Sequence, residues 1–456
     1  MPTFLSSKIS QISFGLLLTV LFGFLILKSS LFGILLLVLV IFIVCLFLNF
    51  KVGLVLVIFT LLLGQLTRFS LSSGGSIVLN DFLIPLVFFV WLLIKLRKKE
   101  IPIYKTSLNW PLGLFILIAL FSLLLNWNHF LPSEIIQGAA YLVRFVSYAL
   151  VFFLTLDVVK DKDTFSKFYN FAIWTGLLFA FLGFLQLVFI PSFEFMAKYG
   201  WDPHLNRLLS TFFDPNYAGG FLVLVCSLVL GRMLFTDNKA EKGLWFYAFL
   251  FLTLAIILTY SRSTYLAFAI MVLVIGILRS WRLLLFGALA LVVAFFAFPR
   301  MQERILGGFS LDATAKMRLE NYKEAQEIIE DNWLIGVGYN NLRAVREAYG
   351  QVLDVKSHAA GGFDSTFLTI LATTGVFGLL VYLWLCFRIL KETFKQFWDK
   401  KSSPVLRGLG LGIFAGFLGL IAHSQFVNSL LYPHIMLYLW FVLGLFYAGK
   451  RIFQEI

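Results

Sequence analysis

Apolar residues form one long run after another along this chain, and short polar stretches separate the runs. Fourteen runs are candidate membrane spans, at roughly 12–27, 31–48, 52–66, 78–95, 110–126, 135–157, 168–190, 217–235, 244–259, 262–278, 283–298, 366–387, 405–422 and 433–449. A helix of about 20 apolar residues crosses a hydrocarbon core of about 30 Å. Because some runs are short enough to merge, the pattern predicts an all-α polytopic membrane protein with about 12–14 transmembrane helices.

One long polar interval, from Pro299 to Asp364, interrupts this pattern. We therefore expect N-terminal transmembrane helices in 1–298, a large, partly helical loop in 299–365 and C-terminal transmembrane helices in 366–456. Within the loop, the spacing of three or four residues predicts a helix with one stripe formed by Arg318, Tyr322, Ala325, Ile329 and Trp333. The segment GVGYNN after it predicts a helix stop and a turn.

Composition supports a membrane protein, because 60% of the residues are hydrophobic and only 13% are charged, against about a quarter charged in soluble domains. The net charge of +13 is spread over short clusters between apolar runs, so we expect no nucleic acid partner. The 3 cysteines lie inside apolar runs and offer neither a disulfide framework nor a metal site.

Basic residues concentrate in alternate inter-span segments, and the positive-inside bias then places both termini in the cytoplasm and the long loop outside it. The first apolar run resembles a signal peptide in length. No small-residue cleavage site follows it, so we expect it to be retained as the first span.

Three arginines near the extracytoplasmic ends of the predicted spans are candidate ligands for a substrate diphosphate: Arg207, Arg262 and Arg318. The planar, permanently charged guanidinium matches pairs of phosphate oxygens. Each has a structural alternative, because Arg318 also fits a snorkelling side chain or a partner of one Glu, and Arg262 fits an interfacial anchor. For Arg144, deeper in an apolar run, we expect a partner in Glu134, Asp157 or a backbone carbonyl.

Transfer of a glycan from a diphosphate also needs a base, and His358 and Asp364 at the end of the loop are the candidates. Asp364 also fits a capping residue for the following helix. No DxD, HExxH or Cys/His motif is present, so we expect no metal or cofactor, with arginine stabilising the leaving diphosphate instead.

The segments RLLSTFFDPNYAGG, LTYSRSTYLAF, RLENYKEAQEIIEDNWLIGVGYNNL and DSTFLTILATTGVFG, in this order before the last spans, resemble the O-antigen ligase and O-antigen polymerase superfamily. The resemblance covers roughly Arg207 to Gly378. It implies a multispan (GT-C-like) glycosyltransferase of the bacterial inner membrane that uses undecaprenyl-diphosphate-linked oligosaccharides. It also implies that Arg262 and Arg318 bind the diphosphate, with Arg207 nearby.

Ligases of this superfamily carry a histidine, then Asn, Ser or Gln, nine residues and GxxG. This chain has Asp364 and Ser365 in those places, then Gly375 and Gly378. The departure favours the polymerase branch and leaves the base open between Asp364 and His358.

The leading hypothesis is therefore a surface-polysaccharide polymerase that joins lipid-linked repeat units. The alternatives are a ligase that moves the glycan to lipid A core or to a protein, and a lipid-linked oligosaccharide transporter. Expected partners are the lipid-linked glycan and membrane lipid, with room for a chain-length regulator.

Overall fold

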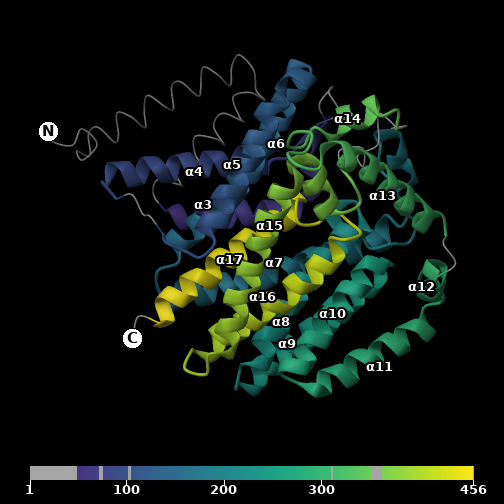
Figure 1. The fold of residues 1–456 in the computed structure, drawn as a ribbon. Helices are drawn as coiled ribbons and strands as arrows, with labels where there is room; N and C mark the ends of the chain where they lie inside the picture. The colour runs from purple at the N-terminus through teal and green to yellow at the C-terminus, as the bar shows by residue number, and fades with distance from the viewer. Residues whose placement is uncertain (1–48, 71–74, 101–103, 310–311, 352–361, 455–456) are drawn as a thin grey trace, which may run out of the picture. The chain divides into compact units, whose positions relative to one another are not determined.

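A computed structural model describes residues 49–70, 75–100, 104–309, 312–351 and 362–454 (Figure 1). The predicted spans at 12–27 and 31–48 lie outside the described residues. The helices are α3 (Phe50–Phe59), α4 (Asn80–Arg97), α5 (Asn109–Leu125), α6 (Pro132–Val158), α7 (Lys162–Phe189), α8 (Pro215–Leu234), α9 (Lys239–Leu258), α10 (Arg262–Leu278), α11 (Trp281–Ala297), α12 (Pro299–Phe309), α13 (Ala313–Asn332), α14 (Leu342–Ala348), α15 (Thr366–Trp398), α16 (Pro404–His423) and α17 (Pro433–Gln454).

Short elements join these helices. The 3-10 turns are η1 (Thr60–Thr67), η2 (Trp127–His129), η3 (Glu194–Tyr199) and η4 (Ser210–Phe212). Strands β1 (Phe69–Ser70) and β2 (Ser76–Ile77) pair antiparallel, with Phe69 opposite Ile77.

The chain forms two compact units. The smaller holds the start of α3 and residues 86–101, within which Phe88 and Trp91 lie with ring centroids 5.3 Å apart. The larger holds 57–85 and everything from 102 onward, and the candidate site described below belongs to it.

The all-α multi-pass prediction is confirmed. In the described part of the chain, 8 helices are long and apolar enough to cross a membrane, and the bent pair α11–α12 makes up to 9 if it forms one span. Helices α5 and α10 are shorter and apolar, and α4 is an 18-residue helix with charged ends. Every predicted span after residue 49 therefore falls on a helix, although the count of 12–14 stays a prediction.

Helix α8 lies at the centre of the larger unit, packed against α7, α9, α10 and α16. A Cβ on Gly231 would lie 2.2 Å from the Gly408 carbonyl oxygen, so the backbones of α8 and α16 touch there. Small residues allow this close approach between helices in a membrane. On the outer faces, large apolar side chains such as Val188, Ile277 and Phe387 stay exposed, as a lipid-facing surface requires.

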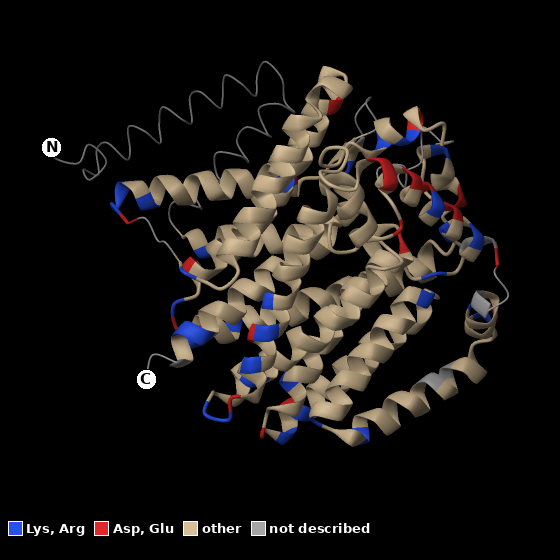
Figure 2. Ribbon diagram, viewed as in Figure 1, with Lys and Arg blue, Asp and Glu red and all other residues tan. Residues whose placement is uncertain are grey.

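The polar interval forms α12, α13 and α14, at a break of 101° after α11. Figure 2 shows acidic and basic residues mixed over α13 and α14, while Lys and Arg dominate the opposite ends of α8, α15 and α17. The predicted stripe of α13 needs one correction, because Ala325 and Ile328 are fully buried whereas Trp333 is 57% exposed. Trp333 is the C-cap, where the chain already leaves the helix.

Candidate functional site

The turn between α9 and α10 gathers several arginines around Tyr260. Tyr260 has a positive φ of 49°, and its carbonyl oxygen accepts hydrogen bonds from Arg207 Nη2 at 3.2 Å and Arg304 Nε at 3.4 Å. The Arg300 guanidinium lies 5.0 Å from the centre of its ring. The Tyr260 carbonyl therefore serves as the common acceptor for one side chain from the loop before α8 and one from helix α12.

Arg207 is nearly inaccessible, at 8% exposed, and its Nε also donates to the Thr259 carbonyl at 2.9 Å. Burial, and then the charge of Arg304, lower its pKa. Arg207 stays a cation at neutral pH. The guanidinium N–H groups of Arg207 hold the backbone of residues 259–260 in place. In this conformation Arg207 therefore has a positioning role.

Arg262 is the first residue of α10 and points to Asp312, the N-cap of α13. Its Nη1 and Nη2 donate to the two carboxylate oxygens at 3.1 and 3.0 Å. Although burial alone would raise the pKa of Asp312, the Ala315 N–H, Arg262 and Arg304 lower it. The predicted diphosphate ligand Arg262 is thus held by a bidentate ion pair, and this carboxylate partner was missed from the sequence.

Arg318 lies six residues further along α13 and has a different environment. Its guanidinium lies 5.9 Å from the centre of the Phe426 ring. Among the described residues no carboxylate forms an ion pair with it. Arg318 therefore keeps both edges of its fork available for an anion.

Asp364 lies close to the same face of α13. Its backbone N–H donates to Asn321 Oδ1 at 2.8 Å, and the nearby Tyr322 hydroxyl donates to the Gln425 carbonyl. Two neighbouring residues of α13 therefore attach it to the start of α15 and to the loop before α17. Arg318, one turn earlier on α13, is near enough for its charge to lower the pKa of Asp364.

The capping alternative for Asp364 is wrong, because Ser365 is the N-cap of α15 and accepts from the Leu368 N–H at 3.3 Å. Burial raises the pKa of Asp364, while Arg318 lowers it and Asp214 raises it further. In the described part of the chain no hydrogen bond or ion pair engages the Asp364 carboxylate. The other predicted base, His358, lies outside the described residues.

Asp214 is a second half-buried carboxyl group near the arginines. It caps α8 through the N–H groups of Asn216 and Tyr217, at 2.7 and 3.1 Å. Burial raises its pKa, and the Tyr217 N–H and Arg207 lower it. Burial, followed by Arg207, lowers the pKa of the neighbouring His204 to about 4, so this histidine is neutral at pH 7.

The predicted turn GVGYNN is hydrogen-bonded to α15 at a break in that helix. Gly375 has a φ of 66° inside α15, and a Cβ there would lie 2.2 Å from the Leu334 carbonyl oxygen. The Val337 N–H donates to Ala372 at 2.9 Å and the Val376 N–H to Trp333 at 2.8 Å. The segment that follows α13 therefore packs directly against the backbone of α15 at Gly375, the first glycine of the GxxG pattern.

Of the partners named for Arg144, neither Glu134 nor Asp157 forms an ion pair with it among the described residues, whereas a backbone carbonyl does accept from it. Its Nε and Nη2 donate to the Asp81 carboxylate at 2.7 and 2.5 Å, and Nη2 also donates to the Ser76 carbonyl. Glu134 instead accepts from the Leu131 N–H at the start of α6. Since Arg144 is fully engaged, we assign it a structural role.

Arg300 and Arg304 were missed from the sequence. They are four residues apart in PRMQER and so share a face of α12. That spacing next to the polar interval was the available signal.

Comparison with known families bears on this arrangement. Residues 247–383 match the O-antigen ligase family model. The matched stretch holds Arg262, Arg318 and Asp364, but not Arg207, and it covers under a third of the 456 residues. No curated protein matches the chain. The match supports the resemblance to the O-antigen ligase and polymerase superfamily and does not separate the two branches.

Proposed function

We propose that this chain is a membrane glycosyltransferase that polymerises a surface polysaccharide from undecaprenyl-diphosphate-linked repeat units. The main support is the placement of Asp364 and Arg318 close together within the stretch that matches O-antigen ligase. A carboxyl group of raised pKa near an arginine that no described carboxylate pairs with offers a base and an anion ligand at one place.

In the proposed reaction the growing glycan is the donor and a lipid-linked repeat unit is the acceptor. The acceptor hydroxyl oxygen attacks C1 of the donor sugar, and the C1–O bond to the diphosphate breaks. The bonding electrons leave with the polyprenyl diphosphate, which Arg318 stabilises, and the hydroxyl proton moves to Asp364. His358 stays the alternative base.

Arg262 joins Arg318 on the diphosphate when it releases Asp312. Asp312 and Arg318 are six residues apart along α13, which is about 9 Å at the rise of a helix. Two long arginine side chains span that separation, so one diphosphate can contact both. Arg207 contributes by holding the turn from which Arg262 starts.

We place the loop of 299–365 outside the cytoplasm, at the outer face of the bacterial inner membrane, with both termini inside. The support is the gathering of basic residues at the end of the helices opposite α13 (Figure 2), together with the positive-inside bias.

The test is reconstitution of the purified chain in nanodiscs with labelled lipid-linked repeat units. We expect products that grow by one repeat at a time, and at least a 100-fold lower rate for Asp364→Asn, the range for losing a general base. The matched control is Asp163→Asn, an exposed carboxylate of α7 paired with Lys167, which keeps the parent rate.

Alternative acceptors decide the branch. Transfer to lipid A core or to a protein, without chain growth, would replace polymerase by ligase. Movement of labelled substrate across vesicles without bond formation would instead indicate a transporter.

A further inference from the structure

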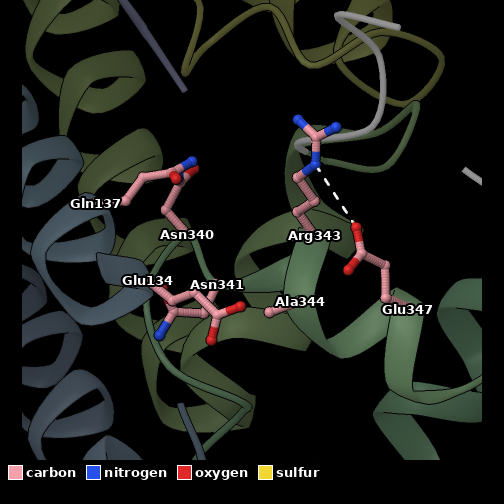
Figure 3. Close-up of a pocket in the computed structure, with 7 residues that line it drawn as sticks. All are labelled: Glu134, Gln137, Asn340, Asn341, Arg343, Ala344 and Glu347. Atoms are coloured by element: carbon pink, nitrogen blue, oxygen red, sulfur yellow. Dashed lines mark ion pairs between the residues drawn. The ribbon is translucent and has the colours of Figure 1, made fainter. Parts of the chain in front are cut away.

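A polar cavity lies between the start of α6 and the segment that leads into α14 (Figure 3). It encloses about 100 Å³, with an open mouth, and its lining is Glu134, Gln137, Asn340, Asn341, Arg343, Ala344 and Glu347. The volume is that of about three water molecules. It therefore suits one edge of a small polar group rather than a whole ligand.

Among the described residues, the side-chain amide of Asn341, which lines the cavity, has a hydrogen-bond donor without a partner. Only 4% of the residue is exposed, and among the described residues no acceptor pairs with its Nδ2. A buried donor without a partner is rare and unfavourable. An oxygen atom of a ligand in the cavity would satisfy this N–H group.

The lining selects the class of ligand. The Arg343 Nε lies 3.8 Å from the Glu347 carboxylate, and Glu134 accepts from the Leu131 N–H. The lining thus has two carboxylates against one arginine, which disfavours an anionic ligand. Three side-chain amides offer donors and acceptors side by side. The described lining offers no apolar wall for a lipid tail. It also offers a phosphate no arginine that is free of a carboxylate, since Arg343 lies beside Glu347. Hydroxyl or acetamido groups of an uncharged sugar match both requirements.

The cavity belongs to the same folded module as Arg318 and Asp364. The turn before it hydrogen-bonds to the break in α15, with the Gly338 N–H donating to Thr373 at 3.2 Å. Arg346 of α14 donates to Glu324 of α13 at 2.6 Å and to the Gly362 carbonyl at 3.3 Å. A sugar in the cavity is therefore fixed to the helix that carries Arg318.

A Gly on α6 creates the space for this turn. A Cβ on Gly138 would lie 2.6 Å from Asn341 Oδ1 and 2.9 Å from the Tyr339 carbonyl oxygen. The left-handed φ of 61° at Asn340 turns the chain at the same place. The cavity is thus part of the packing between α6 and the loop.

We infer that this cavity is a saccharide subsite, which binds one polar edge of an uncharged sugar residue of the glycan, away from the bond that reacts. This inference rests on the proposed function for the identity of the glycan. The subsite fixes the acceptor or donor chain by one sugar, so that the diphosphate end is not its only anchor.

The test is binding without transfer. Saturation-transfer NMR on the full chain in nanodiscs uses glucose, galactose and N-acetylglucosamine as probes, with inorganic phosphate as the anionic arm. We expect a saturation-transfer signal from at least one sugar. We also expect that adding inorganic phosphate leaves the intensity of that signal unchanged. Ala344→Leu, which fills the cavity, and Gln137→Ala, which removes a lining amide, each reduce that signal at least fivefold.

The matched control is Ala348→Leu, at an exposed position of the same helix, which keeps the parent signal. No sugar signal from the parent, an equal signal from both cavity variants, or displacement by phosphate would overturn the subsite. Asp364→Asn separates this from the proposed function, because it retains sugar binding while it loses transfer. Full transfer by that variant would refute the base and leave the subsite standing.

Discussion

Arg262 and Arg318 are the two arginines that the sequence predicts for one diphosphate, and the structure gives them opposite surroundings. Arg262 has both terminal nitrogens on the Asp312 carboxylate. Arg318 has an aromatic face, the Phe426 ring, as its described contact. A bidentate ion pair competes with a phosphate for the same fork, whereas a cation–π contact leaves the nitrogens at the edge free.

The comparison teaches that charge alone does not make a ligand. Arg262 must first exchange one anion for another, so its net gain from a diphosphate is small. Arg318 has no ion pair with a described carboxylate to give up. We therefore expect the contribution to transfer to be unequal, with most of it from Arg318.

The largest expected effect is on Arg318. Replacing it in Arg318→Ala lowers kcat/KM at least 100-fold, about 2.7 kcal/mol, because a preorganised cation at the leaving diphosphate is lost. Arg262→Ala lowers it less than tenfold in the same assay of chain growth. Lys316→Ala, an exposed cation two residues before Arg318, serves as control. An equal or greater loss for Arg262→Ala would reverse the assignment.

A second prediction concerns pH. Asp364 acts as a base only when deprotonated, and burial raises its pKa above the ordinary 3.8, so the rate falls as pH drops through this raised value. Removing the positive charge in Arg318→Ala raises the pKa further and moves the acid limb of kcat/KM to higher pH. Arg262→Ala leaves the limb in place. A limb that does not respond to Arg318 would contradict the pairing.

A third prediction tests the ion pair of Arg262. Asp312→Asn keeps an oxygen to cap α13 but removes the charge that holds Arg262. The released fork binds the donor more tightly, and we expect KM to fall several-fold with kcat nearly unchanged. Titration of the lipid-linked donor at fixed acceptor measures this. A higher KM would mean that the ion pair positions Arg262 rather than restraining it.

The smallest expected effect on the rate of transfer comes from a substitution at the break of α15, where the main effect is on stability. Gly375→Ala places a Cβ against the Leu334 carbonyl and strains a left-handed φ, at a cost of about 1–3 kcal/mol. Thermal unfolding in nanodiscs reports a lower midpoint. Gly243→Ala in α9, where a Cβ meets nothing within 4 Å, is the control and keeps the parent midpoint. An unchanged midpoint for Gly375→Ala would show that the junction yields easily.

Much of the helical framework was predictable, because a 20-residue apolar run has few alternatives to a helix in lipid. The helix of the polar interval and its glycine stop were predictable for a similar reason, since periodicity and turn chemistry act over a few residues. The ion-pair partners of the arginines were not predictable from the sequence. Asp81 for Arg144 and Asp312 for Arg262 lie 63 and 50 residues away along the chain, and no local pattern marks them.

By itself, then, the sequence determined that the chain crosses a membrane many times, that one polar interval interrupts the spans, and which residue types stand ready for an anion and a proton. Tertiary structure alone decided that Arg262 is paired, that no described carboxylate forms an ion pair with Arg318, and that Ser365 rather than Asp364 caps α15. Burial in lipid depends on the composition of each segment, whereas the partner of a charge depends on which distant segments pack together.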